Sequence, residues 1–305
     1  MDKGKNKLKF EKHFIQINFP LKWDLKLKFN VLPERPTPCV VENGEWRRAI
    51  NFNERLIPLI VKFDKKERIV VFTNKVTKNE WKNIRRLIIE SHGLKNVKKL
   101  YEFMEKDRVL KKIKNELYGF GRAGLMSANV YEGVIKAIVQ QQISLRVAEN
   151  IIANIVERYG RRIEFCGTYV YNFPSPETIA NLKLEELRNC GLSFRKSEYI
   201  KEFSCEVEKG FNPDELKSKN EEEIMEILTS FRGIGRWTVE LVMVASMGKN
   251  VIPADDLGVK KAISHFYFKD ELQSPEKVKK FAENRFGNFL RDILIYLLMA
   301  YRMGL

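Results

Sequence analysis

The sequence predicts an α+β protein in which a small antiparallel β-sheet domain packs on a larger helical domain. In the first quarter of the chain, short segments alternate apolar and polar residues, as strands with one buried face do. Farther along, apolar residues recur every three or four positions, and capping residues mark the starts of helices. We place the sheet domain with its covering helices at residues 1–115 and the all-helical domain at residues 116–305.

Four segments of the first domain have the pattern of strands, namely Phe14–Asn18, Leu25–Phe29, Leu59–Phe63 and Ile69–Thr73. Turn-forming residues separate them, and the pair Asn43-Gly44 is typical of a two-residue hairpin. Thr77 and Glu80 have the spacing of a capping box, which predicts a helix that continues through Ile89. This helix would cover one face of the sheet.

Several helix starts are well marked in the second domain. Ser175 and Ser274 each precede a proline and a glutamate, as expected of an N-cap followed by a first helical turn. Further helices are predicted at Asn129–Val139, Ser144–Tyr159, Arg195–Lys209 and Asn288–Arg302. We see no repeat and no low-complexity linker, so we expect the two domains to pack tightly across a cleft.

The composition favours a folded protein with a polyanionic partner. The 305 residues are 44% hydrophobic and carry a net charge of +15, with an isoelectric point near 9.5. Lysines and arginines near phosphates gain affinity by releasing counterions, so nucleic acid is the first candidate. Because the chain also has 40 acidic residues, a solvated surface charge explains the composition equally well.

Targeting signals and cysteine motifs are missing from the sequence. The N-terminus lacks a signal-peptide core, and the apolar run Ile293–Ala300 is too short for a bilayer, so we expect no membrane partner and a cytoplasmic, nucleoid-associated protein. The four cysteines are widely spaced and form no C-x-x-C pair, which indicates neither a zinc site nor a disulfide framework. We expect no required cofactor.

A glycine turn joins two apolar-periodic segments in the second domain. Asn220 and Glu223 form a capping-box pattern for a first helix at Glu221–Phe231. Gly233 and Gly235 then allow a tight reversal with outward-facing amides, and the second helix opens at the same point. A phosphate would be bound well there, although a Gly-apolar-Gly turn alone is more often a packed corner that binds nothing.

Four stretches of the second domain share one resemblance. They are Ala137-Ile-Val-Gln-Gln-Gln-Ile-Ser144, Gly191-Leu-Ser-Phe-Arg-Lys-Ser197, Thr229-Ser-Phe-Arg-Gly-Ile-Gly-Arg-Trp-Thr238 and Ile252-Pro-Ala-Asp-Asp-Leu-Gly-Val-Lys-Lys261. They resemble the helix-hairpin-helix DNA glycosylases, specifically the 3-methyladenine DNA glycosylase II branch. The resemblance covers roughly residues 131–261 well and both ends loosely. It implies a monomeric base excision repair enzyme that excises alkylated purines, of the 3-methyladenine and 7-methylguanine type, from double-stranded DNA.

Asp256 matches the family's catalytic carboxylate. From the residues alone, Asp255 or Asp256 could simply cap the helix Leu257–Phe268; with the resemblance, Asp255 becomes the cap or an orienting group. Breaking an N-glycosidic bond develops positive charge on the sugar. A fixed carboxylate stabilises this charge and can orient or deprotonate the attacking water.

Trp237 lies where glycosylases that also cut the strand carry a Schiff-base lysine. Without an amine there, water is the expected nucleophile and an abasic site the expected product. The resemblance also implies a substrate pocket that contains Trp237 and Leu241, with Trp23 and Phe29 of the first domain as further aromatic walls. An aromatic face attracts the positive charge of an alkylated purine, although each of these aromatic residues could instead be core.

The resemblance also implies the contacts with DNA. Gln142 matches the position that fills the gap left by a flipped nucleotide, with Gln141 beside it, although the same residues could form a plain exposed loop. The amides of Gly233 and Gly235 and the guanidinium of Arg236 would hold the DNA backbone.

The family also places a monovalent cation on hairpin carbonyls. Here they match Thr229, Phe231 and Ile234, which implies a possible structural Na⁺ or K⁺ ion. Arg232 replaces the proline that is usual before the first glycine, so we expect a looser turn and an added phosphate contact. Other branches carry a four-cysteine iron-sulfur loop near the C-terminus, but no cysteine follows Cys205, and we expect no cluster.

Two alternatives stay open at this level. One is an enzyme of the same fold that acts on another lesion, such as 8-oxoguanine, hypoxanthine or uracil. The other is a non-catalytic DNA-binding protein that uses only the hairpin. The absence of a lysine at position 237 argues against the strand-cleaving oxidised-guanine type.

Overall fold

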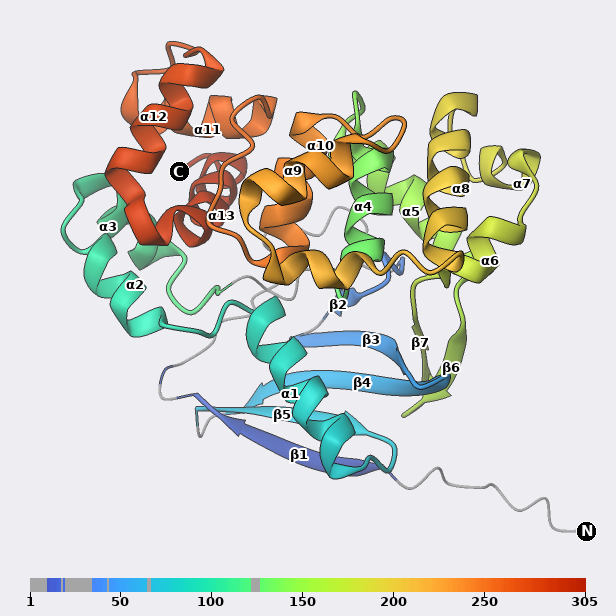
Figure 1. Ribbon diagram of the computed structural model, residues 1–305. Helices are drawn as coiled ribbons and strands as arrows, with labels where there is room; N and C mark the ends of the chain where they lie inside the picture. The colour runs from blue at the N-terminus through green and yellow to red at the C-terminus, as the bar shows by residue number, and fades with distance from the viewer. Residues whose placement is uncertain (1–9, 18, 20–34, 43, 65–66, 122–126) are drawn as a thin grey trace, which may run out of the picture.

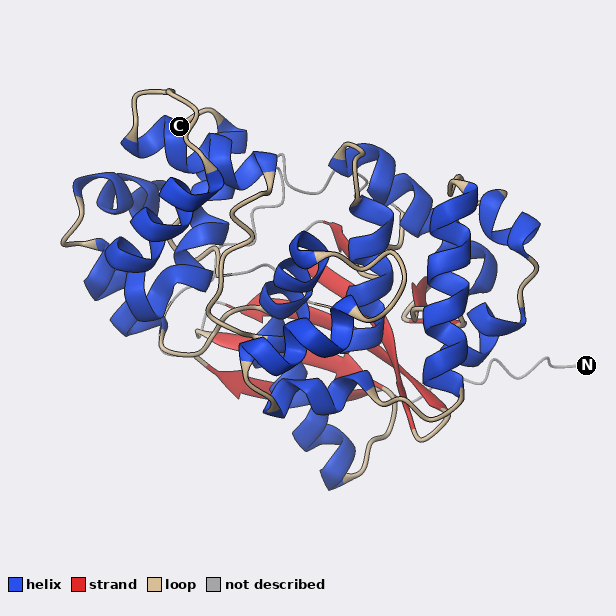
Figure 2. Cartoon of the chain, turned by 45° about the horizontal axis from the view of Figure 1, so that its top comes forward, coloured by secondary structure: helices blue, strands red, loops and turns tan. Residues whose placement is uncertain are grey.

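The structure is a computed structural model that describes residues 10–17, 19, 35–42, 44–64, 67–121 and 127–305. It confirms the α+β prediction: an antiparallel sheet lies beneath a larger helical layer (Figures 1 and 2). No helix in these ranges is long and apolar enough to span a membrane.

The first domain is built on a five-stranded antiparallel sheet with the strand order β1-β5-β4-β3-β2. Its strands are β1 Glu11–Gln16, β2 Val40–Glu42, β3 Glu45–Phe52, β4 Arg55–Asp64 and β5 Arg68–Thr73. Three predicted strands correspond to β1, β4 and β5. Glu42 pairs with Glu45, so the strands on either side of the predicted Asn43-Gly44 turn are paired as expected, while Asn43 itself lies outside the described residues. The fourth predicted strand, Leu25–Phe29, lies outside the described residues.

Helix α1, Lys78–Ser91, crosses one face of the sheet as expected. The Thr77 hydroxyl accepts the Glu80 N–H and the Glu80 carboxylate accepts the Thr77 N–H, so the capping box is present. Ile84 and Ile88 are buried and pack into one cluster with the sheet residues Ile57 and Val71. The first domain therefore has a core of its own.

Helices α2, Val97–Met104, and α3, Arg108–Glu116, pack away from the sheet. Their buried side chains belong to a cluster formed with the C-terminal helices α11 Leu257–Tyr267, α12 Pro275–Phe286 and α13 Leu290–Met303. These residues were predicted to belong to the sheet domain, but their apolar faces cover the C-terminal end of the helical domain.

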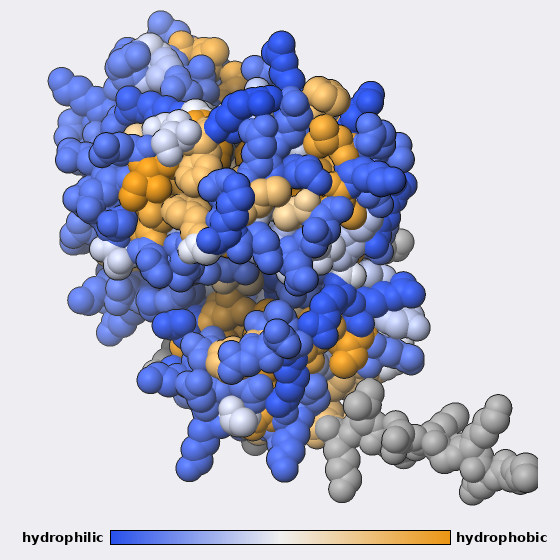
Figure 3. Space-filling model, turned by 45° about the vertical axis from the view of Figure 1, so that its right-hand side comes forward, coloured by the Kyte–Doolittle hydropathy of each residue, from blue (hydrophilic) through white to orange (hydrophobic). Residues whose placement is uncertain are grey.

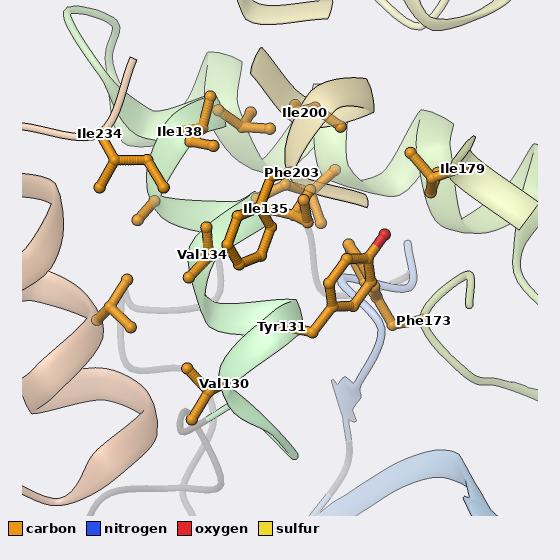
Figure 4. Packing of buried hydrophobic residues seen from close by; sticks show 14 of the residues in the cluster. Val130, Tyr131, Val134, Ile135, Ile138, Phe173, Ile179, Ile200, Phe203 and Ile234 are labelled. Atoms are coloured by element: carbon orange, nitrogen blue, oxygen red, sulfur yellow. The ribbon is translucent and has the colours of Figure 1, made fainter. Parts of the chain in front are cut away.

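The central helical cluster surrounds α4, Val130–Gln140, which is buried along most of its length. Figure 4 shows Val134, Ile135 and Ile138 of this helix packed among residues of neighbouring elements. The other helices that contribute buried residues to this cluster are α5 Leu145–Tyr159, α6 Pro176–Asn181, α7 Leu184–Arg188, α8 Phe194–Glu208, α9 Glu221–Thr229 and α10 Arg236–Val242. Short helical turns η1 Pro213–Ser218, η2 Met243–Met247 and η3 Gly287–Phe289 complete the set. The predicted N-caps Ser175 and Ser274 are confirmed.

The second domain is not all-helical, and this part of the prediction was wrong. Strands β6, Arg162–Phe165, and β7, Thr168–Tyr171, form a hairpin between α5 and α6. Phe165 and Val170 are buried against Ala49, Leu56 and Ile60 of the sheet domain. Four residues are too few to show a clear alternation of apolar and polar side chains. In addition, the burial of these strands depends on a sheet that is distant in the sequence.

The two domains meet across a buried ion pair and a cavity. Arg48 on β3 donates to Glu132 on α4 over 3.0 Å, and each side chain is 1% exposed. Beside this contact lies a cavity of about 920 Å³, lined by Phe52 from the sheet and by Tyr131 and Phe173 from the helical domain. Figure 3 shows a hollow between the two parts of the molecule. The expected cleft is present, and charged side chains join the domains next to it.

Candidate active site

The hairpin between α9 and α10 is a tight turn fixed by backbone hydrogen bonds. Ile234 N–H donates to the Phe231 carbonyl over 3.1 Å. Gly233 has φ +81°, and a Cβ there would lie 2.1 Å from the Tyr199 ring. Only glycine fits both the conformation and the space. Gly235, the N-cap of α10, has no side chain to occupy the first-turn amides, which suits them to an anion.

Arg232 does not loosen this turn. Its guanidinium donates to Glu198 over 2.7 Å and Glu202 over 2.9 Å, both on α8, and lies 5.2 Å from the centre of the Tyr199 ring. Arg232 therefore has two carboxylate partners on α8, and the expected phosphate contact stays a prediction. Arg232 fastens the hairpin to the domain.

Arg236 remains at the surface at the start of α10. Its Nε donates to Glu240 over 2.9 Å along the same helix. The pKa of Arg236 is raised by this hydrogen bond and by the charges of Glu240 and Asp255. The exposed guanidinium keeps its charge beside the free amides of the hairpin.

Asp256 is the N-cap of α11, with its carboxylate held by two donors. Oδ1 accepts the Val259 N–H over 2.9 Å, and Oδ2 accepts the Trp237 Nε1–H over 3.3 Å. Of the two roles expected for Asp255, cap or orienting group, the cap was wrong: the helix begins at Leu257, so Asp256 directly before it is the N-cap, and Asp255 is exposed. The matched carboxylate is therefore fixed by a helix and an indole together.

Arg302 on α13 is a charged neighbour that sequence reasoning missed. Burial lowers the pKa of Arg302, and the negative charges of Asp256 and Glu149 oppose this shift. A Cβ at Gly258 would lie 3.0 Å from Asp256 Oδ1 and 3.7 Å from Leu298, so α11 and α13 approach closely here. No local sequence pattern could have shown that the last helix places the positive charge of Arg302 near Asp256.

The predicted pocket residues are only partly placed. Trp237 and Leu241 lie one turn apart on α10, both half-buried, and Leu241 packs against the central cluster. The structure brings Trp237 to Asp256. Trp23 and Phe29 lie outside the described residues.

The loop between α4 and α5 separates the roles of two neighbouring glutamines. Gln142 is exposed, with φ +54°. The Gln141 side chain instead donates to the Gly233 carbonyl over 2.8 Å and to Thr238 Oγ1 over 3.0 Å. Gln141, which we expected beside Gln142 on DNA, ties the loop to the hairpin, and Gln142 points out.

Metal sites formed by side chains are absent from the described part of the chain. It contains no group of three or more His, Cys, Asp or Glu residues able to hold a metal ion, and its four cysteines are free. The carbonyls of Thr229, Phe231 and Ile234 belong to the hairpin and its preceding helix end. Carbonyl oxygens are hard ligands that suit alkali cations, so the cation stays a prediction at this position.

The fold and this site define a class of DNA repair proteins. Residues 135–287 match the HhH-GPD superfamily of base excision DNA repair proteins, and residues 13–96 match the AfAlkA-like, TATA-box binding protein-like domain. The chain belongs to the HhH-GPD superfamily.

The chain is also similar to individual 3-methyladenine DNA glycosylases. A solved 3-methyladenine DNA glycosylase from Archaeoglobus fulgidus is 50% identical with a TM-score of 0.89, over 96% of this chain and 99% of that one. A DNA-3-methyladenine glycosylase of Bacillus subtilis is 28% identical, over 80% of this chain and 83% of the relative. The Schizosaccharomyces pombe 3-methyladenine DNA glycosylase, solved with abasic DNA, is 28% identical with a TM-score of 0.55, over 64% and 92%. The chain spans 51% and 64% of the lengths of the first two curated relatives that it matches.

Proposed function

We propose that this chain is a monofunctional DNA glycosylase of base excision repair that hydrolyses alkylated purines, of the 3-methyladenine and 7-methylguanine type, from double-stranded DNA. Membership of the superfamily supports the reaction class. Similarity over nearly the whole length to a 3-methyladenine DNA glycosylase supports the substrate class. The net charge of +15 suits a DNA partner.

The observation that carries this proposal is the fixed carboxylate of Asp256. It is held by the Val259 amide and the Trp237 indole, so it needs little reorganisation when charge develops on a nearby sugar. Position 237 offers an indole in place of an amine, so no covalent intermediate forms there. Water is the nucleophile.

The other parts of the site fit a base-flipping reaction. The hairpin amides and Arg236 hold the phosphate backbone, and Gln142 fills the gap left by the flipped nucleotide. The glycosidic bond breaks with its electron pair moving onto the base, which leaves readily because alkylation makes it cationic. Water then bonds to the sugar carbon and gives its proton to the Asp256 carboxylate.

Three further properties belong to the same proposal. The carbonyls of Thr229, Phe231 and Ile234 would hold a Na⁺ or K⁺ ion, which would add positive charge to the hairpin next to the phosphate. The enzyme acts as a monomer, and it works on the chromosome in the cytoplasm.

Base release from methylated duplex DNA tests the proposed function. Wild-type protein should release 3-methyladenine or 7-methylguanine, identified by mass, and strand breaks should form only after alkali treatment. Absence of any released base would contradict the glycosylase assignment. Breaks without alkali would contradict the monofunctional mechanism.

A further inference from the structure

Lys196 makes two hydrogen bonds that the reaction described above does not use. It lies in the first turn of α8, where its ammonium donates to the Val139 carbonyl over 2.9 Å and the Gln141 carbonyl over 2.7 Å. Both carbonyls belong to the C-terminal end of α4. Burial lowers the pKa of Lys196. The half-buried ammonium therefore anchors these two carbonyls.

The loop that Lys196 holds is also fastened from its other side. The Gln141 side chain donates to the Gly233 carbonyl in the hairpin and to Thr238 Oγ1 on α10. Gln141 is therefore held through its side chain by these two partners and through its carbonyl by Lys196. The next residue, Gln142, has φ +54°, a conformation that costs a non-glycine residue roughly 1 kcal/mol. Such a conformation persists where its surroundings hold it.

We propose that Lys196 is a positioning residue that sets the Gln141–Gln142 loop for strand insertion. This inference rests on the proposed function. It adds that α8, through Lys196, holds the loop that takes part in base flipping. Lys196 satisfies helix-end carbonyls and places a cation at the negative end of the α4 dipole. With the loop fixed, Gln142 enters the duplex without first losing conformational freedom.

Lys201 provides a matched control on the same helix. Its ammonium donates to the Ala180 carbonyl over 2.9 Å and also to the Leu182 carbonyl, at the end of α6. Lys196→Met and Lys201→Met therefore each remove one cation from two backbone carbonyls. Only the first change touches the loop that carries Gln142.

The test compares two substrates under single-turnover conditions, each a duplex oligonucleotide with one 7-methylguanine. In one duplex the lesion faces cytosine, and in the other it faces an abasic-site analogue, so that less pairing energy opposes flipping. Lys196→Met should lower the rate on the paired lesion about tenfold, as loss of a charge-assisted hydrogen bond predicts, and the rate on the unpaired lesion less than about twofold. Lys201→Met should leave the ratio of the two rates unchanged.

A general loss of structure would lower both rates together, and an equal loss on the two substrates would overturn the proposal. A double-mutant cycle with Gln142→Ala provides the second measurement. If Lys196 acts through Gln142, Lys196→Met should have little further effect in the Gln142→Ala background, whereas additive effects would also overturn the proposal. Wild-type release from both substrates is required throughout, because its absence is the failure of the proposed function and not of this inference.

Discussion

At the scale of single residues, Asp256 combines a structural and a chemical role. One carboxylate oxygen accepts the Val259 N–H and the other accepts the Trp237 indole N–H. Each oxygen can accept a further hydrogen bond, so the group stays available to water while its orientation is fixed. The helix cap therefore supports the proposed chemistry and does not compete with it.

Replacing Trp237 with phenylalanine should separate the aromatic face of this residue from its hydrogen bond. The ring remains, but the 3.3 Å contact with Asp256 is lost. A hydrogen bond to a charged group contributes about 1.5 kcal/mol or more, so we expect a single-turnover excision rate about tenfold lower. DNA affinity, measured by fluorescence anisotropy, should not change. An excision rate equal to that of wild type would show that the indole N–H does not orient the carboxylate.

At the scale of elements, the hairpin depends on two glycines for different reasons. Gly233 has a positive φ and the Tyr199 ring against its Cα, whereas a Cβ at Gly235 would meet no atom within 4 Å. Packing therefore requires a glycine at position 233 but not at position 235.

Gly233→Ala should destabilise the protein by roughly 2 to 4 kcal/mol, from backbone strain and the clash with the ring. Gly235→Ala should cost about 1 kcal/mol or less, because alanine is only a poorer N-cap. Chemical denaturation of both variants measures the difference. Equal losses of stability would contradict the packing described for the hairpin.

Local rules predicted most elements but not which elements meet. The capping boxes at Thr77 and Asn220 fixed the starts of α1 and α9, because each depends on residues within one turn. The β6–β7 hairpin was missed, because its strands are buried by a sheet from another part of the chain. The contacts of Arg232 with α8 were missed for the same reason.

The same limit applies to the candidate site. Asp256 and Trp237 were found through a motif, and their contact agrees with it. The effect of the Asp256 charge on Arg302, in contrast, depends on how the last helix packs. The Lys196 contacts depend on packing of α8 on α4. Sequence patterns report neighbours along one helix, and these residues are neighbours only in the folded molecule.

At the scale of the whole molecule, the Arg48–Glu132 pair joins the sheet domain to the helical domain. Lys136 lies 3.6 Å from the other carboxylate oxygen of Glu132. A buried pair of this kind often adds little net stability, but removing one partner leaves a buried charge poorly compensated.

Arg48→Met should therefore lower the free energy of unfolding by about 3 to 5 kcal/mol. The double variant Arg48→Met with Glu132→Gln should recover part of this loss, because no carboxylate then stays buried beside the methionine. Urea denaturation of the three proteins gives the comparison. A single variant as stable as wild type would show that the ion pair does not hold the domains together.

The central claim is that the Asp256 carboxylate performs base excision, and the Asp256→Asn variant tests it most directly. Asparagine can still accept the Val259 N–H as an N-cap, so the fold and DNA binding should persist. Single-turnover release of 7-methylguanine from duplex DNA should fall at least about a hundredfold, because the negative charge that stabilises the sugar is gone. Release by the folded, DNA-bound variant at the wild-type rate would contradict the assignment of Asp256 as the catalytic residue.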